Sequence, residues 1–484
     1  MFPKLLWRFH PFCFGISLET FQTGAIRSSH GPHYPRPILP PVFPRLPGTV
    51  KHELDGAIAT NQLMNQQCGR ITTGKTDNSG RVKGLRVALF SGNYNCVRDG
   101  ANQALNRLVG FLEKSGAEVR VFSPTSKTPA FDPAGKLYSV PSVSIPRRRE
   151  YRVAAPLPRH FQADLEAFRP DVIQISAPDI LGCSALRFAE KRGIPTVASV
   201  HTRFETYFKY YGLGWVEGLT QRYMSWIYNR CQHVYVPSKC MADILRDYGV
   251  RSDIRYWSRG VEHDRFKPGR RDMAWRRSLG FADDQPVVAF VGRVVMEKGL
   301  APFAEAVDGL TEKGLKFGVL VVGAGPARSW FEQRLPDAVF TGALFGTDLA
   351  RAYASSEIFF NPSTTEAFGN VNLEALASGI PVVSARASGS SSIIEHGKTG
   401  FLVDPEDDGG FGRALAQLIQ DTDLRDRMGA AGVQVSYRYH WDDILNEVVG
   451  HYFSAIEAFQ AEKDMTPSRR RFAPSVFERP GMSK

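Results

Sequence analysis

Short apolar runs alternate with longer amphipathic stretches through most of the chain. From residue 85 onward, runs rich in valine, isoleucine and alanine are separated by stretches whose apolar positions recur at intervals of three and four residues. The first pattern is typical of buried strands and the second of helices that cover a sheet. In the first half we expect strands at 85–91, 116–123, 171–176, 195–200 and 233–237, and helices at 101–114, 181–192 and 239–248.

The same alternation starts again in the second half of the chain. Strands are expected there at 286–292, 318–323, 338–340, 358–361, 380–384 and 400–403. Apolar strands that alternate with helices imply a parallel sheet covered on both faces. The expected fold class is therefore α/β, with two Rossmann-like, doubly wound domains joined by the polar segment 258–285.

The two ends of the chain differ from this pattern. Residues 1–84 hold a dense proline cluster and little periodicity, and their opening lacks the order of a signal peptide. We expect a disordered extension or a start codon placed too early, while a transit peptide stays open because the segment is poor in acids. Aromatic residues at helical spacing over 437–462 predict a C-terminal helix that packs back on the first domain, or a simple terminal helix of the second. Residues 463–484 form a basic tail.

The net charge of +11 is concentrated in the ends of the chain. Residues 1–84 contribute +6 and residues 463–484 contribute +4, so the part between them is nearly neutral. That distribution argues against a specific nucleic-acid partner and suggests at most weak contact of the tails with anionic lipid.

Other bulk features are those of a cytoplasmic globular protein. The chain lacks an apolar run long enough to span a membrane, and its six cysteines form no Cys-x-x-Cys pair. The sequence therefore predicts neither a disulfide framework nor a cysteine-bound metal, and a reducing cytosol is the expected location.

Two carboxylates eight positions apart stand out near the C-terminus. Glu366 follows the expected strand 358–361, and Glu374 lies on the first turns of a helix that ends near Gly379. Backbone N–H groups at such a helix N-terminus favour phosphate or another anionic oxygen, and the two carboxylates can accept hydrogen bonds from the hydroxyls of a sugar and of a ribose. The candidate donor-binding residues here are Phe368, Gly369, Asn370, Val371 and Glu374. Together these features predict a nucleotide-sugar site.

Cations and glycines follow two earlier strands of the same half. Arg293 and Lys298 come after the strand at 286–292, beside glycine turns. The planar, forked guanidinium group of arginine and the compact charge of the lysine ammonium group both suit a diphosphate. Gly323 ends the next strand in Gly-Ala-Gly-Pro, a weaker signal that many α/β turns share. We expect all three residues to bind the donor.

The Glu-x7-Glu segment, together with Gly-Arg…Glu-Lys-Gly, resembles the motifs of retaining GT-B glycosyltransferases of family 4, over residues 85–460. The resemblance implies an acceptor domain at 85–262 and a donor domain at 263–436, with the site in the cleft between them. It implies catalytic roles for Glu366, His201, Arg293 and Lys298, with His201 near the 6-hydroxyl of the donor sugar and Gly100 at the phosphate. Asp99 is expected to cap a helix rather than bind the acceptor. No Asp-x-Asp follows a strand, so neither a metal nor a cofactor is expected.

Further segments narrow the resemblance to GDP-mannose-dependent α-mannosyltransferases and sulfoquinovosyl-diacylglycerol synthases. These segments are 141–156, 168–172, 201–211 and 257–268. Such relatives act on lipids, and the basic and aromatic stretch 203–211, with Trp215, Arg222 and Trp226, suits peripheral contact with the inner face of a membrane as well as it suits core packing. The expected donor is GDP-mannose or a UDP-sugar, and the expected acceptor is a lipid or glycan hydroxyl. Alternatives are a transferase for soluble exopolysaccharide precursors, a nucleotide-sugar 2-epimerase, which the glutamate pair disfavours, and a catalytically silent nucleotide-sugar-binding protein.

Overall fold

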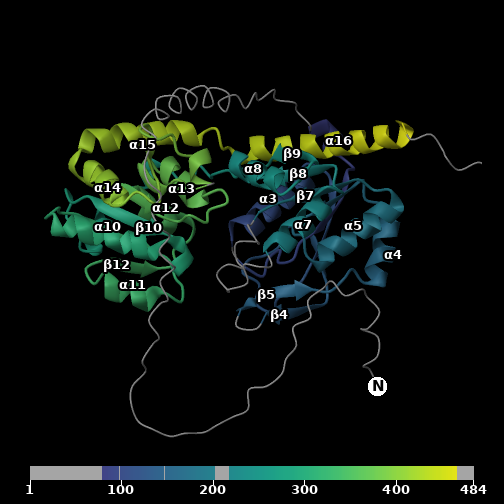
Figure 1. The fold of residues 1–484 in the computed structure, drawn as a ribbon, viewed down its shortest axis with the longest axis horizontal. Coiled ribbons are helices and arrows are strands. Elements are labelled where there is room, and N and C mark those ends of the chain that lie inside the picture. The colour runs from purple at the N-terminus through teal and green to yellow at the C-terminus, as the bar shows by residue number, and fades with distance from the viewer. Residues whose placement is uncertain (1–78, 98, 146–147, 202–216, 388, 466–484) are drawn as a thin grey trace, which may run out of the picture. The chain divides into compact units, whose positions relative to one another are not determined.

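The structure, a computed structural model, describes residues 79–97, 99–145, 148–201, 217–387 and 389–465. It contains two parallel sheets, each covered by helices, and a separate two-stranded hairpin. Figure 1 shows the elements with their labels. The stretch 203–211 and Trp215, which the sequence suggested for membrane contact, lie outside the described residues.

The first sheet has the strand order β3-β2-β1-β6-β7-β8-β9, and all of its strands are parallel. Its strands are β1 (Arg86–Phe90), β2 (Glu118–Ser123), β3 (Lys136–Ser139), β6 (Val172–Ile175), β7 (Thr196–Ser199), β8 (His233–Val236) and β9 (Asp253–Tyr256). The helices of this half are α2 (Ser79–Val82), α3 (Gly100–Lys114), α4 (Arg159–Phe168), α5 (Ile180–Arg192), α7 (Glu217–Tyr228) and α8 (Lys239–Asp247).

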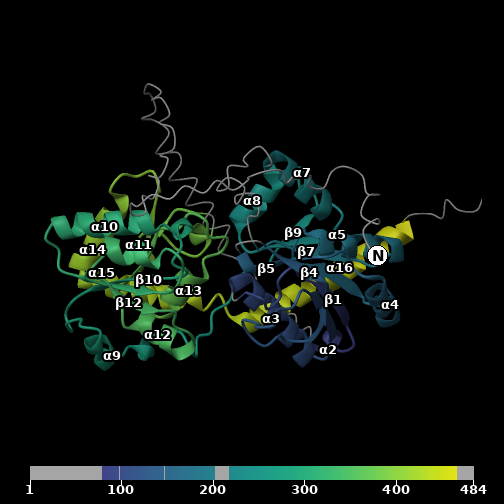
Figure 2. The ribbon, with the colours of Figure 1, turned by 90° about the horizontal axis from the view of Figure 1, so that it is seen from below.

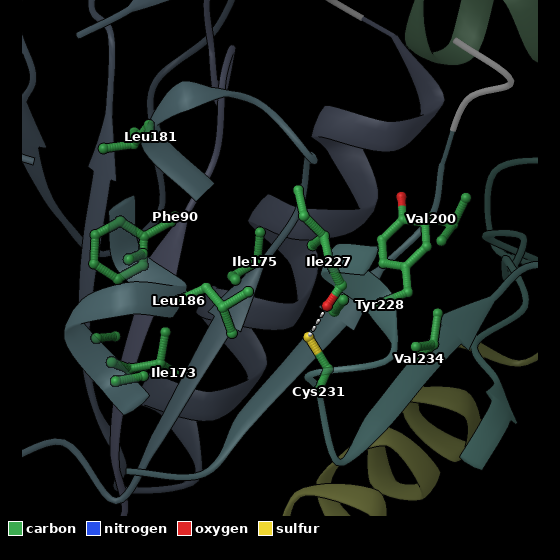
Figure 3. Packing of buried hydrophobic residues seen from close by; sticks show 14 of the residues in the cluster. Phe90, Ile173, Ile175, Leu181, Leu186, Val200, Ile227, Tyr228, Cys231 and Val234 are labelled. Carbon is green, nitrogen blue, oxygen red and sulfur yellow. Dashed lines mark hydrogen bonds between the residues drawn. The ribbon is translucent and has the colours of Figure 1, made fainter. Parts of the chain in front are cut away.

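Alternate residues of each strand enter opposite layers of the core, because successive side chains of a strand point to opposite faces. Ala88 and Phe90 of β1 pack in a cluster with residues of α4, α5, α7 and α8. Figure 3 shows part of this layer, with Leu186 of α5 against the strands. Val87 and Leu89 pack on the other face with α3 and with α16 (Trp441–Met465). The inner strands β1, β6, β7 and β8 are therefore buried on both faces, as their largely apolar sequences predict.

The second sheet has the order β12-β11-β10-β13-β14-β15 and is also parallel throughout. Its strands are β10 (Val287–Val291), β11 (Gly318–Val322), β12 (Val339–Gly342), β13 (Ile358–Asn361), β14 (Val382–Ala385) and β15 (Gly400–Val403). Its helices are α9 (Met273–Ser278), α10 (Leu300–Glu312), α11 (Arg328–Arg334), α12 (Gly346–Ala354), α13 (Asn370–Ala377), α14 (Gly410–Gln420) and α15 (Thr422–Ser436), with the short 3-10 turns η2 (Pro268–Arg270), η3 (Met296–Lys298) and η4 (Ser390–Ser392). Two further core clusters fill its faces.

Helix α16 returns to the first sheet, although it follows the last helix of the second half. It contacts α3 and β7, and Val448, Val449 and Tyr452 are fully buried in the cluster on that face. Figure 2 shows α16 beside α3. A single backbone bridge pairs Val261 with His440 where the chain passes between the two halves. Residues from the last part of the chain are thereby placed under the sheet of the first part.

Several elements were not expected from the apolar pattern. Strands β3 and β9 are short and only partly buried, and β4 (Ser142–Ile145) pairs with β5 (Arg148–Ala154) in an antiparallel hairpin. Partly exposed strands carry fewer apolar residues, which explains why the pattern missed them. Helix α2 precedes residue 85, and its Val82 is buried, so folded structure begins within the expected extension. Among the described residues, no helix is long and apolar enough to cross a membrane.

Candidate functional site

One predicted cation and one predicted carboxylate of the second half, Lys298 and Glu366, meet in the loops that follow β10 and β13. Lys298, the last residue of η3, places its Nζ atom 2.6 Å from Oε1 of Glu366 in the loop after β13. The exposed fractions of the two side chains are 28% and 14%, so both groups remain partly open to solvent. A diphosphate can therefore compete with Glu366 for the ammonium group of Lys298. The sequence predicted both residues for the site, but it did not predict that they contact each other.

Glycines allow the loops around this ion pair to pack closely. Gly299, which follows Lys298, has a left-handed backbone with φ of 77°, and a Cβ atom there would lie 2.9 Å from backbone atoms of Pro362. Gly323 follows β11, and a Cβ atom there would overlap the carbonyl oxygen of Gly292. The loops after β10, β11 and β13 are thus in backbone contact, and Arg293 extends from the first of them as an exposed side chain.

The N-terminus of α13 lies directly after Glu366. Gly369 is its N-cap residue, with φ of 91° and ψ of 54°, a conformation that glycine adopts without strain. Phe368 is buried and packs edge-on against Tyr439. A Cβ atom at Gly100, the first residue of α3, would lie 2.5 Å from Nδ2 of Asn370. Gly100, Gly369 and Asn370 are therefore brought together, while Val371 is partly buried in the core beneath.

A buried amide network that the sequence did not single out holds α13 in place. Asn361, at the end of β13, donates to Oδ1 of Asn372 at 3.0 Å, and Asn372 donates to Oγ of Ser390 at 3.1 Å. Ser384 of β14 hydrogen-bonds the same Ser390 hydroxyl at 2.8 Å. All four side chains are buried. The sequence does contain a signal for this network, namely polar residues within otherwise apolar strand and helix runs. Such residues become buried with the run, and buried polar groups require hydrogen-bond partners.

Glu374 occupies a different environment from Glu366. It is one turn into α13, and the hydroxyl of the buried Tyr353 donates to its Oε2 atom at 3.1 Å. Burial raises the pKa of Glu374 to about 7, against the opposing effects of the Tyr353 hydrogen bond and of the Arg265 and Arg107 cations. Arg107 and Arg265 both pair with Glu262. Glu374 can therefore change its protonation state near neutral pH.

Asp99 caps α3 in the first half. Its Oδ1 atom accepts a hydrogen bond from the backbone N–H of Asn102 at 2.8 Å, which matches the capping role expected from the sequence. Burial raises the pKa of Asp99, while the capping hydrogen bonds and the charges of Arg293 and Arg259 oppose that shift. Asp99 is therefore a partly buried carboxyl group beside Gly100.

His201 follows β7 and has protein partners on both ring nitrogens. Its Nε2 atom is 2.9 Å from Oγ of Ser199, and Nδ1 is 2.6 Å from Nη2 of Arg259. Trp257 packs edge-on against the ring at a centroid distance of 5.2 Å. Burial, followed by the Arg259 charge, lowers the pKa of His201 well below its usual value, so the imidazole is neutral. The contacts with Ser199 and Arg259 define the orientation of the ring.

His263 stacks on Tyr437 at a centroid distance of 4.6 Å and contacts Oγ of Ser436. These contacts account for it as part of the packing between α15 and the connecting segment.

Among the described residues, no group of three or more His, Cys, Asp or Glu side chains is placed to hold a metal ion.

Both halves of the chain are similar in sequence to known protein families. The sequence model of Glycosyltransferase Family 4 matches residues 98–265, and that of Glycosyl transferases group 1 matches residues 272–435. A GDP-mannose-dependent alpha-mannosyltransferase of Corynebacterium glutamicum is 30% identical over 78% of this chain and 91% of its own length. A sulfoquinovosyl transferase of Arabidopsis thaliana is 29% identical over 79% of this chain and 76% of its own length.

A solved structure shares the fold at low sequence identity. Sucrose-phosphate synthase from Thermosynechococcus elongatus aligns with a TM-score of 0.65 and 19% identity, covering 77% of this chain and all of that one. The two parallel-sheet domains described above are therefore those of the GT-B fold.

Proposed function

The chain belongs to the family 4, group 1 glycosyltransferases, which use nucleotide sugars, and we propose that it transfers mannose from GDP-mannose to a lipid hydroxyl with retention at the anomeric carbon. The observation that carries the proposal is the Lys298–Glu366 ion pair beside the N-terminus of α13. It gathers a cation for a diphosphate, a carboxylate for sugar hydroxyls and backbone N–H groups for an anion. GDP-mannose is favoured over a UDP-sugar because the mannosyltransferase relative carries that donor in its name.

In the proposed reaction, Arg293 and Lys298 bind the diphosphate of the donor. When the diphosphate takes up the Lys298 ammonium group, Glu366 becomes available to accept hydrogen bonds from sugar hydroxyls. Glu374 accepts from the ribose diol, and Gly323 borders the nucleobase. These roles give each of these charged groups a partner on the donor.

The bond between the anomeric carbon and the β-phosphate oxygen breaks as the acceptor oxygen bonds to the same face of that carbon. The departing phosphate oxygen takes the acceptor proton, so the products are the glycoside and GDP. Arg293 and Lys298 stabilise the negative charge that develops on the leaving group. Electrostatic stabilisation of this kind is usually the largest single contribution to catalysis. His201 lies beside the sugar as a neutral group.

The protonation of Glu374 should make donor binding depend on pH. Only the ionised carboxylate accepts hydrogen bonds from both ribose hydroxyls, and its pKa is about 7. Binding should therefore weaken roughly tenfold between pH 8 and pH 6, as the ionised fraction falls. Calorimetric titration of GDP-mannose, whose diphosphate does not titrate in this range, measures the effect. Glu374→Gln should bind more weakly at pH 8 and lose this dependence, and an unchanged pH profile in that variant would contradict the role of Glu374.

A face of α7 supports the lipid acceptor. Leu219, Arg222, Tyr223, Trp226 and Arg230 are exposed at intervals of three and four residues, so they lie along one side of the helix and its end. The rings of Tyr223 and Trp226 stack at 6.3 Å, and the Arg230 guanidinium lies 4.6 Å from the Trp226 ring. Aromatic and arginine side chains of this kind favour the headgroup layer of an anionic membrane.

Replacing Trp226 with aspartate should weaken binding to anionic vesicles about tenfold or more, because it places a carboxylate where an aromatic ring would enter the lipid interface. Co-sedimentation with vesicles of phosphatidylglycerol and phosphatidylcholine at low salt measures the effect. Trp330→Asp is a matched control, since the exposed fraction is 39% for both tryptophans and Trp330 lies on α11 of the other half. Equal binding by the two variants would exclude α7 as the lipid contact.

The experiment that tests the proposed function is a donor and acceptor screen. The full chain is incubated with GDP-mannose, UDP-glucose or UDP-sulfoquinovose, together with a lipid extract, with water-soluble glycans or with no acceptor, and release of nucleoside diphosphate is followed. Release from GDP-mannose alone, dependent on lipid, supports the proposal, and the anomeric configuration of the product tests retention by NMR. Release from a UDP-sugar overturns the donor, release stimulated only by water-soluble glycans overturns the lipid acceptor, and binding without release favours a silent protein.

A further inference from the structure

A chain of buried hydrogen bonds connects the C-terminal helix α16 with His201. The hydroxyl of Tyr452 on α16 donates to Oε1 of Gln174 on β6. Nε2 of Gln174 donates to Oγ of Ser199 on β7 at 3.2 Å, and that oxygen is 2.9 Å from Nε2 of His201. Tyr452 and Gln174 are fully buried, and Ser199 is 1% exposed. Tyr452 is therefore connected through Gln174 and Ser199 to His201, the residue that is predicted to face the donor sugar.

Arg259 determines which ring nitrogen of His201 carries the proton. A guanidinium group can only donate hydrogen bonds, so Nδ1 of His201, which is 2.6 Å from Nη2 of Arg259, must be the acceptor. In the neutral ring the proton then resides on Nε2, and this N–H donates to Ser199. Arg259 is itself buried and held by the carbonyl oxygens of Trp257 and Ser258. Ser199 and Arg259, the partners of the two ring nitrogens, thus hold His201 in one tautomer and one orientation.

We propose that Tyr452 and Gln174 are positioning residues for His201, so that α16 contributes to the donor-sugar site through Ser199. The proposal rests on the proposed function for the role of His201 itself. Ser199 accepts hydrogen bonds from both Gln174 and His201, and the loss of one donor from this network leaves the remaining groups free to rearrange. The return of α16 to the first sheet then has a catalytic consequence as well as a packing role.

Tyr235 provides a matched control for Tyr452. Its ring lies in the same cluster, 6.2 Å from that of Tyr452, and it is 1% exposed. Its buried hydroxyl has no hydrogen-bond partner among the described residues. Tyr452→Phe and Tyr235→Phe therefore remove the same atom from the same core, but only the first interrupts the path to His201. A purely structural role for the hydroxyl of Tyr452 would affect stability without affecting His201.

The test measures turnover and the state of His201 separately. Full-length protein labelled with ¹⁵N-histidine reports the tautomer through the ring nitrogen shifts, and comparison with His201→Gln assigns the signals. In Tyr452→Phe we expect the His201 signals to shift, and kcat to fall about fivefold with the KM for GDP-mannose nearly unchanged, as the loss of one neutral hydrogen bond predicts. Tyr235→Phe should leave both unchanged. Ser199→Ala, which alters little volume, should reproduce the effect if Tyr452→Phe folds poorly.

Two outcomes overturn the proposal and are distinguishable from each other. Equal effects of Tyr452→Phe and Tyr235→Phe on the signals and on kcat would exclude the hydrogen-bond path. Shifted signals with unchanged kcat would exclude a positioning role, and His201→Ala then identifies the failed step. Full activity of His201→Ala means that the role assigned to His201 in the proposed function is wrong, whereas loss of activity means that other contacts position the ring.

Discussion

Replacing Lys298 with alanine should lower turnover about 100-fold or more, because it removes the cation that we propose stabilises charge on the departing diphosphate. The substitution also leaves Glu366 without the ammonium group that now lies 2.6 Å away. Glu366→Ala should cause a loss of similar size, because the sugar loses a hydrogen-bond acceptor in the transition state. Release of GDP from GDP-mannose under saturating donor and acceptor measures both variants.

Lys398→Ala is the control for this prediction. Lys398 forms an ion pair with Glu395 at the same distance of 2.6 Å, but its side chain is 59% exposed and lies outside the predicted site. Exposed pairs contribute little to stability, so turnover and thermal unfolding should stay close to those of the wild type. If Lys298→Ala retained turnover within threefold of Lys398→Ala, the assignment of the site would be wrong.

Replacing Gly323 with alanine should lower the free energy of unfolding by roughly 2–4 kcal/mol and abolish measurable donor binding. A Cβ atom there would overlap the carbonyl oxygen of Gly292, so the loops after β10 and β11 would have to separate. The backbone of Gly323 also has φ of 155°, which residues with a side chain rarely adopt. Those two loops carry Arg293 and the predicted base pocket, and their displacement would therefore reach the site. Urea unfolding and calorimetric titration with GDP-mannose measure the two effects.

Gly309→Ala is the matched change in the same half of the chain. Gly309 lies within α10, and a Cβ atom there would meet no atom within 4 Å. Alanine favours helix over glycine by up to about 1 kcal/mol, so this variant should be as stable as the wild type or slightly more stable. Comparable unfolding curves for Gly323→Ala and Gly309→Ala would show that the close contact with Gly292 can be relieved.

Most of the fold was predictable because buried parallel strands leave a strong local signal. The run that became β10 is apolar at every position, and those that became β1 and β6 are apolar except for Arg86 and Gln174. Such runs alternate with stretches of helical spacing along the chain. The partly exposed strands β3 and β9 were missed because they leave only a weak local signal, and their pairing depends on neighbours that are distant in the sequence. The start of α2 was missed because Val82 becomes buried only through contacts with the core.

Part of the candidate site was also predictable. Gly369 and Lys298 follow strands whose carboxyl ends meet at one edge of the sheet, which is where ligands bind in such folds. The residue types alone did not show that Lys298 would neutralise Glu366, or that Tyr353 would contact Glu374. Those pairings join residues 68 and 21 positions apart, and no local pattern specifies them.

The sequence by itself determined the α/β class, the two repeated series of strands and the residue types of a nucleotide-sugar site, because each depends on local periodicity or on short motifs. Only the tertiary structure decided the environment of each group. Burial raises the pKa of Glu374, while the buried path from Tyr452 to His201 exists because α16 packs under β6 and β7. Such effects arise from distances between residues far apart in the chain, and these distances are defined only when both sheets and their helices are packed.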